Sequence, residues 1–361
     1  MAAGVTGLGL AGAIVLTAAL CVTPGCSTLA YYAQSVNGHL DLVERARPVA
    51  DWLADSQTGA ELRQRLVLSQ QIRDYAVSEL GLPDNPSYRR YADLKRSAAV
   101  WNVAAAPELS LTLETWCFAV VGCVSYRGYF DRADADAYAA QLRARELEVS
   151  VYGVPAYSTL GKLPFAAFAD PLLNTFIAYP EGELARLIFH ELAHQVAYVA
   201  DDTVFNESFA TAVERIGGRR WLGQAQSGAA LDEYRQLEQR RDQFRALTQA
   251  CRERLQAVYV SSLSDSDKRS AKAALMAQLR ADYQQFKAQL WGGYSGYDNW
   301  FAHANNASLG VLSAYHELVP GFERLFEHEG RDFRRFYDEV RRIAALPRQQ
   351  RRSALSATTG D

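Results

Sequence analysis

The sequence predicts an α+β fold that is mostly helical, with a small mixed sheet and one long helical hairpin. Apolar residues recur at spacings of three and four over most of the chain, which is the period of an amphipathic helix. Strand-forming Trp, Val, Thr, Phe and Tyr are concentrated in residues 98–130. With 361 residues, 49% of them hydrophobic, the chain can bury a sizeable core. Its formal net charge of −3 indicates no nucleic-acid partner.

Residues 1–25 are expected to form a signal peptide. They contain no charged side chain, are rich in Ala, Gly, Leu and Val, and are short for a stable membrane span. The usual Lys or Arg near the start is missing, so the true start codon can lie elsewhere. The apolar run ends at Gly25-Cys26, which resembles a bacterial lipobox although Thr23 and Pro24 depart from it.

Cys26 would carry a lipid and become the N-terminus if this lipobox is used. The protein would then be a periplasm-facing lipoprotein of the cell envelope, held at the membrane by its N-terminal lipid anchor. By analogy with lipoprotein sorting, Ser27 favours the outer membrane. The alternative is cleavage nearby without lipidation.

Cys117 and Cys123 are predicted to form a disulfide. They lie six residues apart in a segment where two short strands and a turn could bring them together. An oxidising compartment permits such a bridge. The alternative is a pair of buried thiols.

Helical segments account for most of the remaining chain. Residues 224–290 form a long polar stretch that is expected to be an antiparallel helical hairpin. Gly217-Gly218 is expected to cap the helix before it, and the polar residues 347–361 are expected to be a disordered tail. The other predicted helices cover residues 31–53, 61–80, 134–147 and 181–200, with one more that begins near Asn206.

The segment HELAH carries a metal-binding pattern. His190 and His194 lie one turn apart on the same helix face, so both imidazoles can point at one ion. Glu191 is displaced by about 100° around the axis, from where it can reach a water on that ion and act as a general base. This is the HExxH arrangement of zinc peptidases. The surrounding residues are apolar, which indicates a buried site helix rather than a surface helix.

A third protein ligand is needed to leave one position open for water. The candidates are Glu207 and Glu214, which are seven residues apart and share a helical face. The segments HELAHQ and NESFATAVE resemble the gluzincin metallopeptidases, in which HExxH is followed by a helix bearing Asn-Glu-x-x-Ala. This resemblance implies a gluzincin-like core that binds Zn²⁺ through His190, His194 and Glu207.

The spacing of the two motifs departs from the gluzincin pattern. Gluzincins separate the second histidine from the ligand by eighteen or nineteen residues, whereas twelve residues separate His194 from Glu207 and nineteen separate it from Glu214. The motif therefore favours Glu207, with Glu214 orienting a histidine, and the spacing favours Glu214. A shorter first helix or a tight turn before the second would reconcile Glu207 with the geometry.

From Cys26 to about Phe322 the chain also resembles a bacterial family named for a predicted aminopeptidase activity. The resemblance implies one metallopeptidase domain over residues 26–346, with the hairpin 224–290 as an insertion. The matching segments are CSTLAYYAQSVNGHLDLVERARPV, WCFAVVGCVSYRGYF, AYSTLG, DPLL, HELAHQ with NESFA, and NNASL with VPGF.

The metallopeptidase resemblance also suggests where a peptide would bind. Metallopeptidases commonly hold the substrate backbone against an edge strand before the HExxH helix, and AYSTLG lies where that strand belongs. AYSTLG has no acidic residue for a free α-amine, so a peptidase is better supported than an aminopeptidase. The expected substrate-binding residues are Tyr157, Ser158, Thr159 and Asn306, and Tyr315 is expected to assist catalysis as a donor to the oxyanion. Asn306 and Tyr315 could instead pack or cap.

These observations predict a zinc-dependent peptidase of the cell envelope, an aminopeptidase by family resemblance, that acts on peptides through a metal-activated water. One alternative is a non-catalytic, zinc-containing envelope lipoprotein that binds partners. Another is a metal hydrolase that acts on a non-peptide amide. Glu191 argues against the non-catalytic protein, because a purely structural zinc site has no use for a base.

Overall fold

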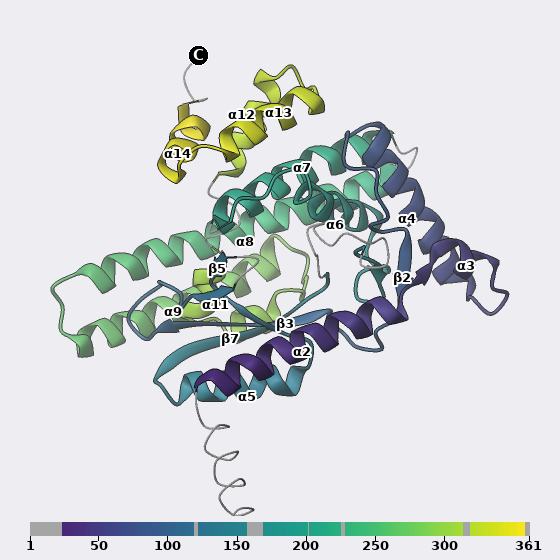
Figure 1. Ribbon diagram of the computed structural model, residues 1–361. Helices are drawn as coiled ribbons and strands as arrows, with labels where there is room; N and C mark the ends of the chain where they lie inside the picture. Colours follow the sequence, from purple (N-terminus) through teal and green to yellow (C-terminus); the bar gives the residue numbers. More distant parts are fainter. Residues whose placement is uncertain are drawn as a thin grey trace, which may run out of the picture.

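The computed structural model describes residues 24–118, 122–156, 169–200, 202–224, 228–312 and 318–357. Helices dominate and the strands form small sheets, which confirms the expected mostly helical α+β class. Figure 1 shows the N-terminal helix along one side of the central strands and the last three helices grouped at the opposite side.

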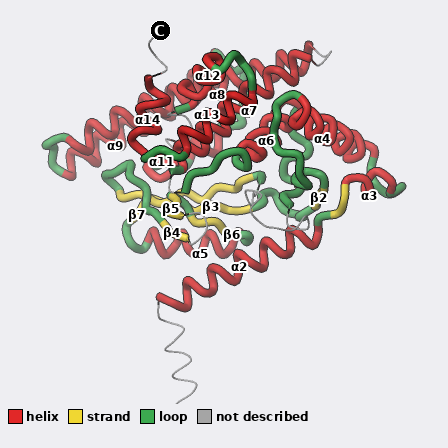
Figure 2. The backbone as a smooth tube through the Cα atoms, turned by 45° about the horizontal axis from the view of Figure 1, so that its top comes forward, coloured by secondary structure: helices red, strands yellow, loops and turns green. Residues whose placement is uncertain are grey.

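The central sheet has three antiparallel strands in the order β6-β3-β7. One face packs against helices α2 and α5 through a cluster that includes Val103, Ala105 and Tyr129 (Figure 2). The strand β3 is buried along almost its whole length, which suits a central strand covered on both faces. The bounds are β3 Val100–Pro107, β6 Arg127–Tyr129, β7 Leu147–Val154, α2 Pro24–Arg45 and α5 Arg132–Arg143.

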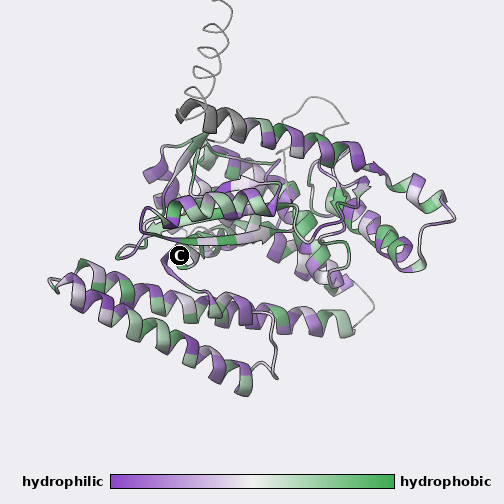
Figure 3. Ribbon diagram, turned by 90° about the horizontal axis from the view of Figure 1, so that it is seen from below, coloured by the Kyte–Doolittle hydropathy of each residue, from purple (hydrophilic) through white to green (hydrophobic). Residues whose placement is uncertain are grey.

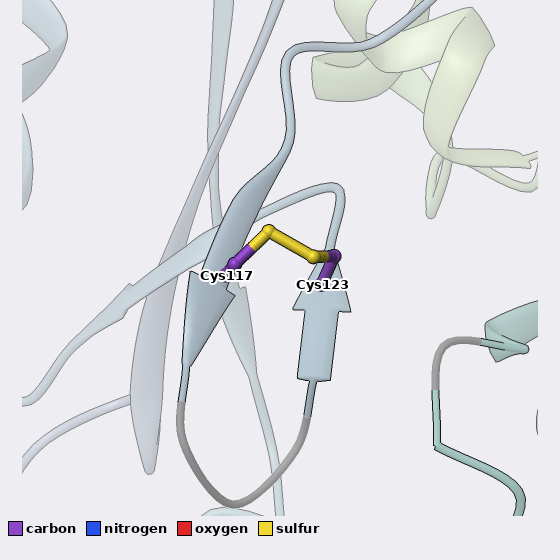
Figure 4. Close-up of a disulfide and its surroundings, with 2 residues drawn as sticks. All are labelled: Cys117 and Cys123. Carbon is purple, nitrogen blue, oxygen red and sulfur yellow. A yellow bond between two sulfur atoms is a disulfide. The ribbon is translucent and has the colours of Figure 1, made fainter.

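A short hairpin precedes the central sheet's strand β6. It consists of β4 (Trp116–Phe118) and β5 (Gly122–Val124), with Cys117 opposite Cys123 in the register. These two cysteines form a disulfide across the hairpin, with their Cα atoms 3.9 Å apart (Figure 4). A separate small sheet has the order β1-β2-β8. The bounds there are β1 Arg47–Pro48, β2 Arg90–Ala92 and β8 Leu172–Leu173, and helix α3 covers Val49–Ala54.

The largest core cluster joins α4, α6 and α7 to the C-terminal helices. Phe205 and Phe209 on α7 pack against Phe322 on α12, with ring centroids 5.2 and 5.6 Å apart. The C-terminal helices therefore cover the helix that carries Glu207. The bounds are α4 Ala60–Ser78, α6 Glu181–Ala193, α7 Thr203–Gln224, α12 Val319–His328, α13 Phe333–Ala344 and α14 Arg348–Ala357.

Helices α8 (Gly228–Val260) and α9 (Asp265–Gln289) pack along each other as a long hairpin that extends from the rest of the fold (Figure 1). Hydrophilic and hydrophobic residues alternate along both helices (Figure 3), as expected for helices that share one buried seam. At the base of the hairpin, Tyr283 stacks on Phe301 with ring centroids 4.0 Å apart. Two short helices follow, α10 (Asp298–Ala302) and α11 (Asn306–Leu312).

Two expectations about helix ends are wrong. The tail was expected to be disordered, but residues 348–357 form α14, on which Leu355 is 1% exposed. Gly217-Gly218 was expected to end a helix, but α7 continues through both glycines to Gln224. Gly217 and Gly218 lie against neighbouring helices, so packing rather than capping determines their role.

Helix α2 starts at Pro24, so the backbone at Cys26 lies in its first turn, and residues 1–23 fall outside the described part. Among the described residues no helix is both long and apolar enough to cross a membrane.

Candidate metal centre

Helix α6 is shorter than its sequence pattern predicts, and this shortening brings Glu207 to the histidines. The helix ends at Ala193 with His194 as its C-cap, instead of continuing to residue 200. The following segment folds back and α7 starts at Thr203. A gap of twelve residues therefore suffices to place a ligand from the second helix beside the first.

Asn206 holds this connection closed. Its side-chain amide donates to the carbonyl oxygen of Val199 and its side-chain oxygen accepts from the Val199 N–H, both at 2.8 Å. Asp202 caps the start of α7, because its carboxylate accepts the N–H of Phe205 at 3.2 Å. The Asn of the Asn-Glu motif thus has a structural purpose, which is to fix the position of the neighbouring Glu207.

Gly217 and Gly218 let α6 and α7 approach closely. A Cβ on Gly217 would lie 2.9 Å from the ring of Phe189, and one on Gly218 would lie 3.1 Å from Cγ of Arg186. Phe189 and Arg186 belong to α6, so any side chain at these two positions would push the ligand helix away from it. The close approach is what lets side chains from the two helices meet at one point.

His190, His194 and Glu207 converge on a single position. The Nε2 atoms of the two histidines are 3.2 Å apart, and Nε2 of His190 is 3.3 Å from Oε2 of Glu207. Nε2 of His194 is 3.8 Å from Oε1 of Glu207. Two ligands bound at about 2.0–2.1 Å to one tetrahedral ion lie roughly 3.3–3.4 Å apart, so the spacing fits. These three residues could hold a metal ion, and no other such group was found among the described residues.

Glu214 contacts the opposite side of the His190 ring. Nδ1 of His190 is 3.1 Å from Oε2 of Glu214, and the other carboxylate oxygen accepts from Arg186. The Arg186 guanidinium also lies 3.6 Å from the carboxylate of Glu183. A carboxylate at Nδ1 fixes the tautomer and orientation of a histidine whose Nε2 binds metal. Glu214 is therefore placed to support His190 rather than to bind the ion itself.

Burial and charge act in opposite directions on the acidic and basic groups here. Burial lowers the pKa of His190, but the hydrogen bonds and charges of Glu207 and Glu214 outweigh it and hold the pKa well above its usual value. Burial lowers the pKa of His194 to about 4. Burial by itself raises the pKa of Glu207 and of Glu214. The adjacent cations outweigh burial, so the pKa of Glu214 is about 2 and the pKa of Glu207 lies below its usual range. The two carboxylates thus remain negative, as a cation site requires.

Glu191 lies beside this cluster without joining it. Burial raises its pKa to about 7; the charge of His190 opposes this, while the carboxylates of Glu207 and Asp170 add to it. A carboxyl group with a pKa near neutrality can both take and return a proton. Asp170 is 2% exposed, so a second buried acid lies near the base.

Three tyrosines near the site are not indicated by any motif in the sequence. The ring of Tyr198 lies 6.3 Å from that of His194, centroid to centroid. Tyr126 and Tyr152 both interact electrostatically with Glu207, although one precedes β6 and the other lies in β7. Strand register brings them together, and a motif search has no access to register. The only sequence signal was the position of Tyr126 directly after the disulfide segment.

Of the residues expected to bind substrate or to assist catalysis beside the metal cluster, the structure describes only Asn306. Tyr157, Ser158, Thr159 and Tyr315 lie outside the described residues. Asn306 is fully buried, and its amide donates to the carbonyls of Pro107 and Glu108 at 3.1 and 2.7 Å.

The expectation that Asn306 contacts substrate is therefore wrong. The Asn306 side-chain oxygen accepts from Tyr259 at 2.8 Å, and its backbone N–H donates to Glu148 at 2.7 Å, so its polar groups are all occupied. Glu148 is four residues before Tyr152 in β7, which corresponds to about 13 Å along the strand. Asn306 joins α11 to the end of the sheet far from the tyrosines at the metal centre.

A comparison with models of protein families identifies the family of the chain. The model of a family described as "Putative aminopeptidase" matches residues 30–355. The chain belongs to this family. The match covers both helices of the metal centre and the central sheet, and the family's name suggests aminopeptidase activity. No curated protein and no solved structure matches the chain.

Proposed function

We propose that this protein is a zinc-dependent peptidase of the cell envelope that removes residues from the free N-terminus of peptides. The observation that carries the proposal is the convergence of His190, His194 and Glu207 on one point, with Glu191 beside them. Membership of the aminopeptidase family supports a peptide substrate. Two imidazoles and one carboxylate are the ligand set of catalytic zinc in peptidases, and this set leaves a fourth position free.

The metal would be held by Nε2 of both histidines and the carboxylate of Glu207. When bound, zinc supplies Lewis acidity, which polarises a peptide carbonyl and lowers the pKa of water. Glu214 and Arg186 hold the His190 ring in the orientation that exposes Nε2. The His190, His194 and Glu207 side chains are only 14%, 7% and 18% exposed, and this partial burial strengthens the attraction between the carboxylate and the ion.

Glu191 would act as the general base and then the general acid. It takes one proton from the attacking water as the new C–O bond forms on the peptide carbonyl carbon. It then passes that proton to the leaving nitrogen as the C–N bond breaks, so the products are a carboxylic acid and an amine. The raised pKa of Glu191 suits both transfers.

The aminopeptidase mode rests on two observations. The family name suggests it, and Asp170 supplies a buried acid in electrostatic contact with the base. A positively charged α-amine is stabilised by such an acid when it enters a buried site. Comparison of free and N-acetylated peptides tests this mode, and equal cleavage of the two would show an endopeptidase.

The envelope location and the lipid anchor at Cys26 are part of the proposal. The uncharged apolar leader supports export, and the disulfide between Cys117 and Cys123 suits an oxidising compartment. Labelling cells with palmitate and fractionating their membranes tests both, with Cys26→Ser as the control. Unlabelled wild-type protein in the soluble periplasm would contradict the anchor.

Metal analysis combined with a Glu191→Gln variant tests the enzyme itself. The wild-type protein is expected to bind about one zinc per chain and to cleave members of a peptide library with free N-termini. Glu191→Gln should keep the zinc and lose about 10²–10⁴-fold in kcat, because a positioned base contributes that much. If the zinc-loaded wild-type protein cleaves no peptide, the protein is better described as a binding lipoprotein with a structural zinc.

A further inference from the structure

Helix α2 presents an exposed, uncharged face to its surroundings. Tyr32, Val36 and Leu40 lie four residues apart on this helix and are 41%, 56% and 48% exposed. Residues at this spacing lie on one face of a helix, one turn after another. The residues around them include no Asp, Glu, Lys or Arg, because the first such residue of the whole sequence is Asp41. Single exposed apolar residues are common, but a row of them without charges indicates an interaction surface.

The opposite face of α2 is fixed to the body of the protein. Leu42 is buried in the largest core cluster. The Gln34 side chain donates to the carbonyl oxygen of Gly128 at 3.3 Å and accepts the N–H of Phe130 at 3.2 Å. The Phe130 ring lies so close to Gly38 that any side chain at position 38 would overlap it. The helix therefore cannot turn its apolar row inward, and whatever covers this row must come from outside the described residues.

The chain before α2 connects this face to the proposed membrane anchor. Residues 1–23 contain no charged side chain, and the proposed lipid attachment at Cys26 lies inside α2, which starts at Pro24. An anchor at this position leaves no linker between the lipid and the helix. At a rise of about 1.5 Å per residue, Tyr32 lies roughly 9 Å and Leu40 roughly 21 Å along the helix axis from Cys26. A helix that is held at its first turn in this way either stands up from the bilayer or lies on it.

We propose that α2 lies along the lipid bilayer, with Tyr32, Val36 and Leu40 in the boundary between headgroups and acyl chains. This inference rests on the anchor in the proposed function and does not depend on peptidase activity. An upright helix would leave the apolar row in water, whereas a helix in the plane of the interface removes the row from water. Tyrosine suits such a boundary, because its ring is apolar and its hydroxyl is polar.

The charge of the lipids should have little influence on this contact. Anionic lipids attract clusters of Lys and Arg near the membrane surface. The row on α2 contains no cation, so burial of apolar surface supplies the binding energy. Zwitterionic vesicles are therefore expected to bind α2 as well as anionic vesicles do.

This contact would also fix the orientation of the protein on the membrane. The central strands lie between α2 and the helices α6 and α7 (Figures 1 and 2). The metal centre on α6 and α7 would therefore be held on the side of these strands away from the bilayer. Such a placement favours substrates that approach from solution over substrates within the membrane.

The test uses the protein purified from membranes with its lipid and reinserted into vesicles of phosphatidylcholine, with or without anionic phosphatidylglycerol. An environment-sensitive fluorescent amino acid replaces Asn37, which is exposed beside the apolar row. In the control it replaces Gln350, which is exposed on α14 at the opposite side of the molecule (Figure 1). The emission from position 37 is expected to shift to shorter wavelength in both kinds of vesicle. Lipids spin-labelled in the upper acyl chain should quench about half of it or more, because an interfacial helix lies about 5–10 Å into this boundary. Position 350 should show neither change.

Two matched variants test whether the apolar row is the cause. Val36→Asp places a charge in the row, whereas Val67→Asp places one at an exposed apolar residue on α4. Val36→Asp should abolish the quenching at position 37, and Val67→Asp should leave it unchanged. Thermal unfolding of both variants should match that of the wild-type protein, because both residues are exposed.

Flotation of the vesicles separates failure of the inference from failure of the anchor. Wild-type protein that floats with the vesicles while position 37 stays unquenched would overturn the inference and leave the anchor standing. Emission that is shifted but not quenched would mean that residues 1–23 or a second copy of the chain cover the row, which also overturns it. Quenching that survives Val36→Asp would show that the anchor alone brings the helix to the lipid, again against the inference. Protein that does not float would overturn the proposed anchor itself.

Discussion

Arg351 in the C-terminal helix α14 pairs with Asp202 at the start of the ligand helix α7. Its Nε and Nη2 atoms donate to one carboxylate oxygen of Asp202 at 3.0 and 2.7 Å, and both residues are buried. The other oxygen of Asp202 caps α7 by accepting the N–H of Phe205. The end of the chain therefore fixes the first turn of the helix that carries Glu207.

Replacing Arg351 with Met is expected to destabilise the protein and weaken the metal site together. Removing one partner of a buried pair costs roughly 3–5 kcal/mol, because the remaining charge stays buried. The lower end is expected, since Arg352 lies 3.8 Å from Asp202 and compensates in part. Urea unfolding and zinc competition measure the two effects. Arg348→Met, at an exposed position of the same helix, is the control. If Arg351→Met is as stable as Arg348→Met, the pair between Arg351 and Asp202 does not stabilise the fold.

The C-terminal helix also shows what the sequence could not reveal. The segment after Pro347 is rich in Arg, Gln and Ser, which is typical of a disordered tail. Its order depends on one buried apolar contact, Leu355, and on a partner for Arg351 that lies 149 residues away in the chain. Local composition contains no information about such a distant partner.

The two carboxylates after HExxH are expected to affect zinc binding unequally. Glu207→Gln removes a ligand and should abolish tight binding, whereas Glu214→Gln removes only the support of His190 and should weaken it about 10–100-fold. Zinc Kd values from chelator competition distinguish the two residues. If Glu214→Gln causes the larger loss, Glu214 is the ligand, as the gluzincin spacing would suggest.

This assignment could be reached only in part from the sequence. The pattern HExxH identified three positions, and the Asn-Glu motif pointed to Glu207 against the expected spacing. The apolar run from Leu187 to Ala200 predicts one continuous helix, but in the structure α6 stops at Ala193. The stop depends on Asn206 binding both backbone groups of Val199, which is a tertiary interaction. The tyrosines of the sheet depend in the same way on strand register.

Gly217→Ala is expected to destabilise the protein although alanine is the better helix former. The new methyl group would lie 2.7 Å from Leu80 and 2.9 Å from Phe189, and both are buried. Overpacking a core costs about 1–3 kcal/mol, which exceeds the gain of roughly 1 kcal/mol in helix propensity. Gly223→Ala on the same helix meets no atom within 4 Å and should stabilise by that gain. Urea unfolding measures the free energy of unfolding of both variants. If Gly217→Ala is as stable as Gly223→Ala, close packing is not the reason for a glycine at position 217.

Removing the disulfide is expected to lower the stability of the fold and to leave the metal centre intact. For a loop of this length, the chain-entropy estimate gives about 2 kcal/mol for the lost constraint on the unfolded chain. The Cys117→Ser, Cys123→Ser double variant should keep the zinc Kd of the wild-type protein, because the hairpin contributes no ligand. Cys251→Ser, which removes the buried free thiol on α8, controls for the loss of a thiol elsewhere. Thermal unfolding and chelator competition are measured on the same samples. A double variant that unfolds at the wild-type temperature would show that the bridge does not stabilise the fold, and a weaker zinc Kd would show that the hairpin supports the metal centre.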